Sequence, residues 1–392
     1  MTATVRAWAE LLRISALFTV PGDALAGAAA IGRRPGRGTV LAVGASLCLY
    51  EAGMALNDWA DRDEDAVDRP HRPIPSGRIT PGAALTAAGA LTAAGLSLAA
   101  RAGRPALTVA TGLAATVWAY DLHLKHTQAG PAAMATARAL DLLLGATATW
   151  GAGAKPEHPD TRTVTVPGPA TGLVQAPAPT PGPAGKPRRG PIARLVGRGG
   201  RALATAVRDA QPRHGEPSRQ AALPLRAALS AAALLGAHTY AVTAVSRHEA
   251  HGGSTVAPLS ALAAVIALGA TAVREQRGHG EVSPAPGCGA AGDNHRLVPG
   301  APAPPNTRTG TSPRLLVTAL TGAYLRTAAE PLLHATLNPS PPLTQRAVGS
   351  GIRAMIPLQA ALAARAGAAG TGLAVMGLVP LARTLARKVS PT

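Results

Sequence analysis

The chain has 392 residues, of which 47% are hydrophobic and only 15% charged, against about 25% charged residues in typical soluble domains. Aromatic residues make up 2% of the chain, and the formal net charge is +18. Nucleic-acid-binding proteins share such a basic balance, but here the arginines are not interleaved with aromatic stacking groups, which argues against a nucleic-acid partner. Basic loops that flank membrane helices explain the charge better.

Long apolar stretches dominate the chain. A helix that crosses a bilayer needs about 20 mostly apolar residues, and nine stretches qualify. They lie at 10–31, 39–57, 81–101, 104–120, 130–151, 223–246, 254–273, 314–336 and 366–385. All are rich in small residues, which let helix backbones approach closely inside lipid. The sequence therefore predicts an all-α, multi-pass protein of the cell membrane with about nine transmembrane helices.

A tenth stretch, 344–364, carries Arg346 and Arg353 seven residues apart, on one helix face. It would lie either along the membrane interface or in the bundle interior. Two other segments, 152–222 and 275–312, are rich in Pro, Gly and Arg and are predicted to be disordered insertions. The membrane parts of the chain would then be 1–151, 223–274 and 313–392.

Carboxylates are concentrated directly after the second apolar stretch. Residues 57–77 read NDWADRDEDAVDRPHRPIPSG, in a chain with only 20 Asp and Glu. If the helix continues, Asn57, Asp61 and Asp65 share one stripe at i+4 steps, with Asp58 beside them. Carboxylates this close stay ionised together only when cations hold them, and hard oxygen ligands in this number suit Mg²⁺. Asp63 and Glu64 would face solvent.

Basic residues follow the acids at once. Arg69, Arg72 and Arg78 lie in a segment with three prolines, which would end the helix and stiffen the loop. Arginine is suited to bidentate phosphate recognition. The pattern predicts an acidic helix end followed by a rigid basic loop. The alternative is an ordinary interfacial loop in which Asp and Arg pair in water.

This region resembles the signature of the UbiA superfamily of intramembrane prenyltransferases, N-D-x-x-D-x-x-x-D after a membrane helix, continued by Arg-Pro, Arg-Pro and Pro-x-Gly. Here the residues are Asn57, Asp58, Asp61 and Asp65, then DRPHRPIPSG at 68–77. The resemblance implies a helical bundle around a central cavity. It also implies that the four residues hold Mg²⁺ and that Arg69 and Arg72 bind an isoprenoid diphosphate.

A second segment, YDLHLKHTQAGP at 120–131, is similar to the family's Tyr…Lys segment. The similarity implies that Tyr120, Asp121 and Lys125 face the cavity as catalytic residues, with Lys125 also on the departing diphosphate. By itself the segment could be a helix end that reaches the interface. Arg13 resembles a first-helix arginine that binds an acceptor's anionic group, or it reaches out to the interface.

Two further charged residues, Arg138 and Asp141, fall inside the fifth apolar stretch. Charges are costly in lipid and usually have a partner or a function there. At i,i+3 spacing on a helix, these two side chains are predicted to pair with each other and to face the bundle interior.

The family's second motif, D-x-x-x-D at the end of the sixth helix, has no full counterpart. Residues 238–254 read HTYAVTAVSRHEAHGGS, in which Glu249 is the only acid. Three alternatives follow: Glu249 supports a weaker metal site, Arg247 replaces a metal's charge on the diphosphate, or catalysis is altered or lost.

The resemblance implies Mg²⁺-dependent transfer of a prenyl group from an isoprenoid diphosphate to an aromatic or lipid-like acceptor within the membrane. A non-catalytic prenyl-lipid-binding or transport-accessory protein on the same fold is the alternative, and a divalent-cation transporter ranks below both. Arginines place the first Asp-rich loop in the cytoplasm. The shortage of aromatic rings favours a small or unusual prenyl substrate, because ring faces stabilise cations.

Overall fold

In a computed structural model the chain is described over residues 3–153, 219–249, 252–274 and 313–380, and every regular element in these ranges is helical. The predicted all-α class is confirmed. Five of the described helices are long and apolar enough to cross a membrane: Arg37–Ala60, Pro81–Ala102, Pro224–Ser246, Val256–Arg274 and Pro341–Arg365. The number of nine stays a prediction.

The two predicted insertions, 152–222 and 275–312, lie almost wholly outside the described residues. At their borders, α7 (Gly130–Gly153) extends the fifth apolar stretch slightly, and α9 (Arg219–Ser246) begins four residues before the predicted span.

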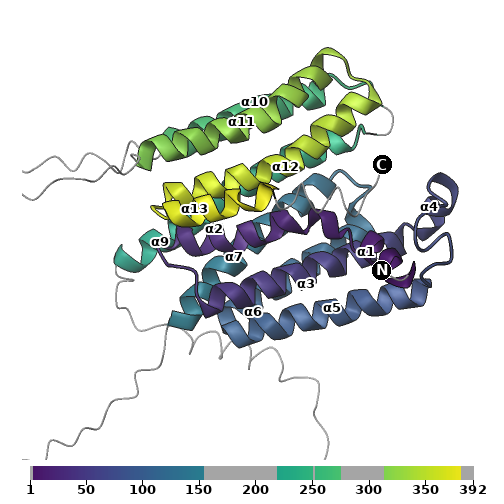
Figure 1. Cartoon of the computed structure of the whole chain (residues 1–392), viewed down its shortest axis with the longest axis horizontal. Helices are drawn as coiled ribbons and strands as arrows, with labels where there is room; N and C mark the ends of the chain where they lie inside the picture. Colours follow the sequence, from purple (N-terminus) through teal and green to yellow (C-terminus); the bar gives the residue numbers. More distant parts are fainter. Residues whose placement is uncertain (1–2, 154–218, 250–251, 275–312, 381–392) are drawn as a thin grey trace, which may run out of the picture. The chain divides into compact units, whose positions relative to one another are not determined.

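Four helices of the first half form the wall on which the site is built (Figure 1). Helix α3 (Arg37–Ala60) packs against α5 (Pro81–Ala102), and α6 (Arg104–Ala119) packs against α7, which also contacts α3. Their shared core consists mainly of alanine and leucine. Gly103 alone joins α5 to α6 at φ 127°, a backbone conformation that side chains with a Cβ rarely adopt.

The single helix predicted over residues 10–31 is wrong. Helix α1 (Ala3–Leu11) ends early, and Arg13 takes the left-handed conformation with φ 49° and ψ 48°. A 3₁₀ turn, η1 (Ile14–Thr19), leads into α2 (Val20–Ala30). Pro21 lies in the first turn of α2, where a residue without an N–H is tolerated, whereas inside a continuous helix it would remove a hydrogen bond.

Helix α2 crosses α7 so closely that their backbones are in contact. A Cβ on Gly145 would lie 2.4 Å from the Cα of Ala24, and one on Gly27 would lie 2.1 Å from the carbonyl oxygen of Leu142. Only glycine permits this approach, as the abundance of small residues in the apolar stretches suggests. The crossing brings the interior of α2 against the helix that carries Arg138.

The second half contains α9, α10 (Val256–Arg274), α11 (Pro313–Leu337), α12 (Pro341–Arg365) and the short α13 (Ala369–Met376). Helix α12 packs against α11, α2 and α13, and 83% of its most apolar window is buried. The tenth stretch, 344–364, is therefore an interior helix. The predicted span 366–385 contains only α13 within the part of the chain that the structure describes.

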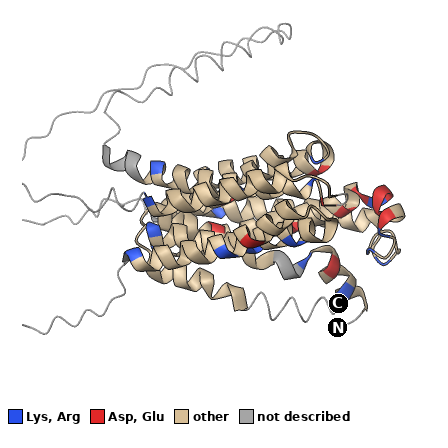
Figure 2. Ribbon diagram, turned by 90° about the horizontal axis from the view of Figure 1, so that it is seen from above, with Lys and Arg blue, Asp and Glu red and all other residues tan. Residues whose placement is uncertain are grey.

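The two ends of the bundle differ in charge. Acidic side chains gather where α4 (Arg62–Asp68) follows α3, and we call this the carboxylate end (Figure 2). At the opposite end, the connections 31–37 and 101–104 carry arginines and no acid. We call this the arginine end. Helices α7, α9, α10 and α11 meet the undescribed stretches at the arginine end (Figure 1).

Candidate active site at the carboxylate end

The Asp-rich motif spans a break between two helices. Helix α3 ends at Ala60, Asp61 has φ −88° and ψ 3°, and α4 follows directly. The helix thus continues past Leu56, as the predicted stripe requires, but only as far as Ala60. The backbone N–H groups still donate four residues back, from Asp61 to Asn57 at 2.9 Å and from Asp65 to Asp61 at 2.8 Å. The break thus turns the chain while it keeps the acids close together.

Two of the acids, Asp58 and Asp65, are buried and paired with arginines. Asp58 Oδ1 lies 3.3 Å from Arg13 Nη2 and 3.2 Å from Arg72 Nη1. The same Arg72 nitrogen lies 2.8 Å from Asp65 Oδ2, and Arg69 Nε lies 3.3 Å from Asp65 Oδ1. With side-chain exposures of 6% for Asp58 and 1% for Asp65, these are not the water-exposed pairs of an interfacial loop.

The second predicted segment faces the first. A π-helical turn, η2 (Tyr120–Leu124), continues α6, and π-turns within helices are frequent at functional sites. Lys125 Nζ donates to Asp61 Oδ1, and Asn57 Nδ2 donates to Asp121 Oδ1 at 3.2 Å. Burial raises the pKa of Asp121 to about 7, against the smaller opposing effects of the Asn57 hydrogen bond and the Lys125 charge.

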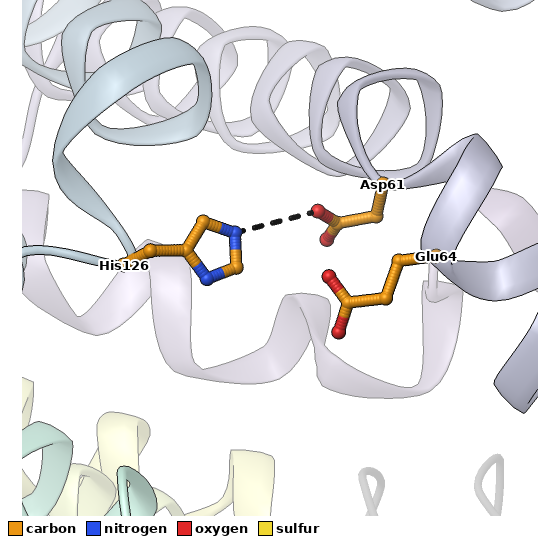
Figure 3. Close-up of side chains that lie close together, drawn as sticks. All are labelled: Asp61, Glu64 and His126. Atoms are coloured by element: carbon orange, nitrogen blue, oxygen red, sulfur yellow. Dashed lines mark ion pairs between the residues drawn. The ribbon is translucent and has the colours of Figure 1, made fainter.

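Two residues that the sequence did not single out as ligands join Asp61. The ligand atoms of Asp61, Glu64 and His126 lie within 4.8 Å of one another. Figure 3 shows the three side chains pointing together, with His126 Nε2 4.0 Å from Asp61 Oδ1. Glu64 and His126 are exposed. Proximity in sequence was the only available signal for Glu64, and no signal pointed to His126.

The oxygen donors fit Mg²⁺. Asp58, Asp61 and Asp65 supply carboxylates and Asn57 an amide oxygen, the hard ligands that Mg²⁺ prefers. Asp65 Oδ1 is buried and accepts no hydrogen bond among the described residues, although Arg69 Nε lies nearby. A metal cation at this oxygen would replace the Arg69 ion pair and supply the contact that no hydrogen bond provides.

The end of α9 also reaches the carboxylate end. Arg247 Nη1 donates to the carbonyl oxygen of Thr127 at 2.6 Å, which ties the α9 end to the loop that carries Lys125. Glu249 is half-buried. Burial raises the pKa of the Glu249 carboxyl, and the charge of Arg69 opposes this. Both residues of the predicted second motif therefore lie on the side of the bundle where the first motif lies.

A cavity of about 270 Å³ extends from these residues into the bundle. One face of α3 lines it with Ser46, Leu49, Tyr50, Gly53, Met54 and Asn57. The opposite walls come from α6, η2 and α7, through Leu113, Val117, Tyr120, Asp121, Met134, Ala137, Arg138 and Asp141, and Arg13 also lines the space. The walls between the two ends are largely apolar.

The predicted pair of Arg138 with Asp141 is wrong. Arg138 Nη1 lies 2.6 Å from Asp23 Oδ2 on α2, while Asp141 accepts a hydrogen bond from Ser46 on α3. Helices α2 and α7 cross so closely that Asp23 lies nearer to the Arg138 guanidinium than Asp141, one turn along α7, does. Sequence reasoning missed Asp23, although an acid inside an apolar stretch was a signal that could have found it.

Comparisons of the sequence point to a family of membrane proteins. The sequence model of the UbiA prenyltransferase family matches residues 15–175, which include both segments at the carboxylate end. Digeranylgeranylglyceryl phosphate synthase of Methanopyrus kandleri is 37% identical over 128 residues, 31% of this chain and 45% of that relative. The match thus spans less than half the length of this curated relative.

Solved structures share the fold. A structure that concerns digeranylgeranylglyceryl phosphate synthase in membranes has a TM-score of 0.51 at 12% identity, covering 93% of this chain and 99% of the other. A UbiA homologue from Archaeoglobus fulgidus, bound to GPP and Mg²⁺, has a TM-score of 0.50 at 15% identity over 95% and 99% of the two chains. At this identity the likeness concerns the fold alone.

Proposed function

Because the chain belongs to the UbiA superfamily of membrane prenyltransferases, we propose that it transfers a prenyl group from an isoprenoid diphosphate to an aromatic or lipid-like acceptor within the membrane, with Mg²⁺. One observation carries the proposal. The carboxylates of Asp58, Asp61 and Asp65 meet Arg72 and Lys125 beside a largely apolar cavity. An ionic end joined to an apolar space suits a substrate with a diphosphate head and a hydrocarbon tail.

The metal would be held by Asn57, Asp58, Asp61 and Asp65, with Glu249 approaching from α9. When bound, Mg²⁺ supplies positive charge that stabilises the departing diphosphate. The donor set supports this role, because all these side chains offer oxygen ligands. Glu64 and His126 extend the same cluster toward solvent.

The basic residues would bind and orient the diphosphate. Arg69, Arg72 and Arg247 present planar guanidinium groups for bidentate contacts with phosphate oxygens. Lys125 would place a point charge where negative charge develops as the bond to the prenyl carbon breaks. All four side chains lie at the carboxylate end, and Arg72 and Lys125 are already ordered by contacts with acids.

The cavity would protect the prenyl cation from water. Its middle walls, which include Leu49, Leu113 and Val117, exclude solvent that would otherwise quench the cation. Tyr120 and Asp121 line the cavity beside Asn57 and would orient the reacting carbon and the acceptor. Arg13, which lines the cavity and pairs with Asp58, would contact a polar group of the acceptor.

Incorporation of labelled prenyl diphosphate into lipid-soluble product by the purified full-length chain tests the proposal. We expect turnover only with Mg²⁺, and a loss of at least about 100-fold in Asp61→Asn, as when one essential electrostatic contact is removed. Asp63→Asn is the matched control, because Asp63 is 86% exposed and pairs only with Arg62 among the described residues. Equal activity of both variants would overturn the proposed role of the carboxylate cluster.

The alternative is a non-catalytic prenyl-lipid-binding or transport-accessory protein. The observation that favours it is the end of α9, where Glu249 stands in place of a second pair of aspartates. In that case the purified chain would bind a prenyl diphosphate in the presence of Mg²⁺ and release it unchanged with every acceptor tested.

A further inference from the structure

The cavity ends in charged and polar groups instead of hydrocarbon. Ser46 of α3 and Arg138 and Asp141 of α7 line the end that lies farthest from the carboxylate cluster. Asn57 and Ser46 are eleven residues apart on α3, which corresponds to roughly 16 Å of helix rise. We call Ser46, Arg138 and Asp141, with Asp23 behind them, the inner polar wall.

Contacts among four helices hold the inner polar wall in place. Arg138 Nη1 lies 2.6 Å from Asp23 Oδ2, and Gln359 Nε2 of α12 donates to Asp23 Oδ1 at 2.7 Å. The same Gln359 nitrogen donates to the carbonyl oxygen of Thr19 at 2.7 Å. A Cβ on Gly22 would lie 2.0 Å from Gln359 Oε1, so only glycine leaves room for this side chain. The wall is thus built into the fold and does not move aside freely.

Contact between the inner polar wall and a hydrocarbon chain is unfavourable. The wall combines two buried carboxylates with one guanidinium, and Arg138 has five N–H groups of which one bonds to Asp23 among the described residues. An apolar chain end pressed against these groups would leave them without water or a partner, which is unfavourable inside a membrane protein.

The space before the wall is short. The cavity measures about 270 Å³, and a cavity of about 150 Å³ holds benzene, a ring of six carbons. In proportion, the cavity takes on the order of ten carbon atoms. That corresponds to a chain of about two isoprene units.

We infer that the inner polar wall limits the donor to short prenyl chains, so that dimethylallyl and geranyl diphosphate bind and longer isoprenoid diphosphates are rejected. The inference rests on the proposed function and adds the substrate class. A tail of four isoprene units would either meet the wall or have to leave the cavity sideways.

Binding of four diphosphates to the full-length chain in detergent with Mg²⁺ tests the inference: dimethylallyl, geranyl, farnesyl and geranylgeranyl. We expect geranylgeranyl diphosphate to bind at least about tenfold more weakly than geranyl diphosphate, a difference of about 1.4 kcal/mol. Equal affinity for the two would overturn the inference. Binding of none of the four would overturn the proposed function and the inference with it.

Variants of the inner polar wall test whether it causes the preference for short prenyl chains. The double variant Asp23→Leu/Arg138→Leu removes the buried ion pair as a unit, so that neither partner is left without the other, and Asp141 keeps its hydrogen bond from Ser46. It should raise the affinity for geranylgeranyl relative to geranyl diphosphate about tenfold, whereas Arg138→Lys should keep the wild-type preference. An unchanged ratio in the double variant would overturn the inference.

If the double variant does not fold, a second variant tests the inference by making the cavity smaller. Ala137→Leu adds volume to the α7 wall of the cavity, between its two ends. It should weaken binding of geranyl diphosphate more than binding of dimethylallyl diphosphate. Equal weakening of both would count against a length limit set by this cavity.

Discussion

Arg72 is the residue that holds two carboxylates of the candidate site together. One of its nitrogens lies 3.2 Å from Asp58 and 2.8 Å from Asp65, from a loop that the three prolines after Asp68 keep out of the helix. Sequence reasoning predicted that this arginine faces a phosphate. The structure adds that Arg72 pairs with Asp58 and Asp65, the acids that are proposed to hold the metal.

We expect Arg72→Lys to weaken binding of pyrophosphate with Mg²⁺ by about 10- to 100-fold, because lysine cannot reproduce the bidentate contacts of a guanidinium. Isothermal titration of the purified chain measures this. Arg62→Lys is the matched control, since Arg62 pairs with the exposed Asp63 and lies over the Trp59 ring at 4.9 Å. The same loss in both variants would contradict a specific role for Arg72.

At the residue scale, the sequence did not reveal which side chains pair with each other across different helices. The motif spacing predicted that Asn57, Asp58, Asp61 and Asp65 are neighbours; in the structure Arg72 joins Asp58 to Asp65, while Asp61 contacts Lys125 and Asn57 contacts Asp121. The partner of Arg138 could not be found in the same way. It depends on how closely α2 crosses α7, which spacing within one helix does not describe.

At the scale of elements, α9, α11 and α12 are joined by a buried polar contact. His238 is fully buried, with Nδ1 3.0 Å from the hydroxyl oxygen of Tyr324 and Nε2 2.9 Å from the carbonyl oxygen of Gly351. Because Gly351 offers only an acceptor, Nε2 carries the proton and Tyr324 donates to Nδ1. Each polar atom of the His238 ring therefore has a partner in a neighbouring helix.

Tyr324→Phe should lower the stability of the bundle by about 1 kcal/mol, because it leaves the buried Nδ1 of His238 without a donor and interhelical hydrogen bonds in membranes are worth about this much. Thermal unfolding in detergent measures the change. Tyr240→Phe on α9, the helix that carries His238, is the control, since Tyr240 is 48% exposed. Equal midpoints for wild type and Tyr324→Phe would show that the contact does not contribute to stability.

Helix α12 shows what composition misses at this scale. Its two arginines left 344–364 either along the membrane interface or in the bundle interior, and the structure places both side chains on the exposed face of an otherwise buried helix. A helix with two charges can pack in the interior when its charged face points outward.

At the scale of the whole molecule, the two ends of the bundle carry different chemistry (Figure 2). The carboxylate end holds the candidate site. The arginine end joins the stretches 154–218 and 275–312, because α7, α9, α10 and α11 meet those stretches there (Figure 1). We propose that the carboxylate end faces the cytoplasm and that the chain continuing from the arginine end lies on the other side of the membrane. The short connections at the arginine end oppose this placement, because arginines in short loops favour the cytoplasmic side.

Cysteine labelling tests this arrangement with residues the chain already offers. In a Cys48→Ala background, native Cys288 reports on the stretch 275–312. In a Cys48→Ala/Cys288→Ser background, Asp63→Cys reports on the carboxylate end. A membrane-impermeant maleimide should label Asp63→Cys only in inside-out vesicles and Cys288 only in right-side-out vesicles. Labelling of both cysteines in the same vesicle type would contradict their placement on opposite sides of the membrane. Labelling of each cysteine in the other vesicle type would keep the opposite placement and reverse only the orientation of the protein.

The sequence by itself determined the helical class and the membrane character, and it predicted the family resemblance and the residues proposed for the site. These depend on apolar runs and on a motif whose residues are neighbours along the chain, so local geometry brings them together. Only the tertiary structure decided that the first stretch breaks at Arg13, that α12 lies inside, and that Asp23 pairs with Arg138 behind the cavity. These depend on contacts between separate helices, such as the approach of α2 to α7 that Gly27 and Gly145 permit, which the sequence of one helix does not describe.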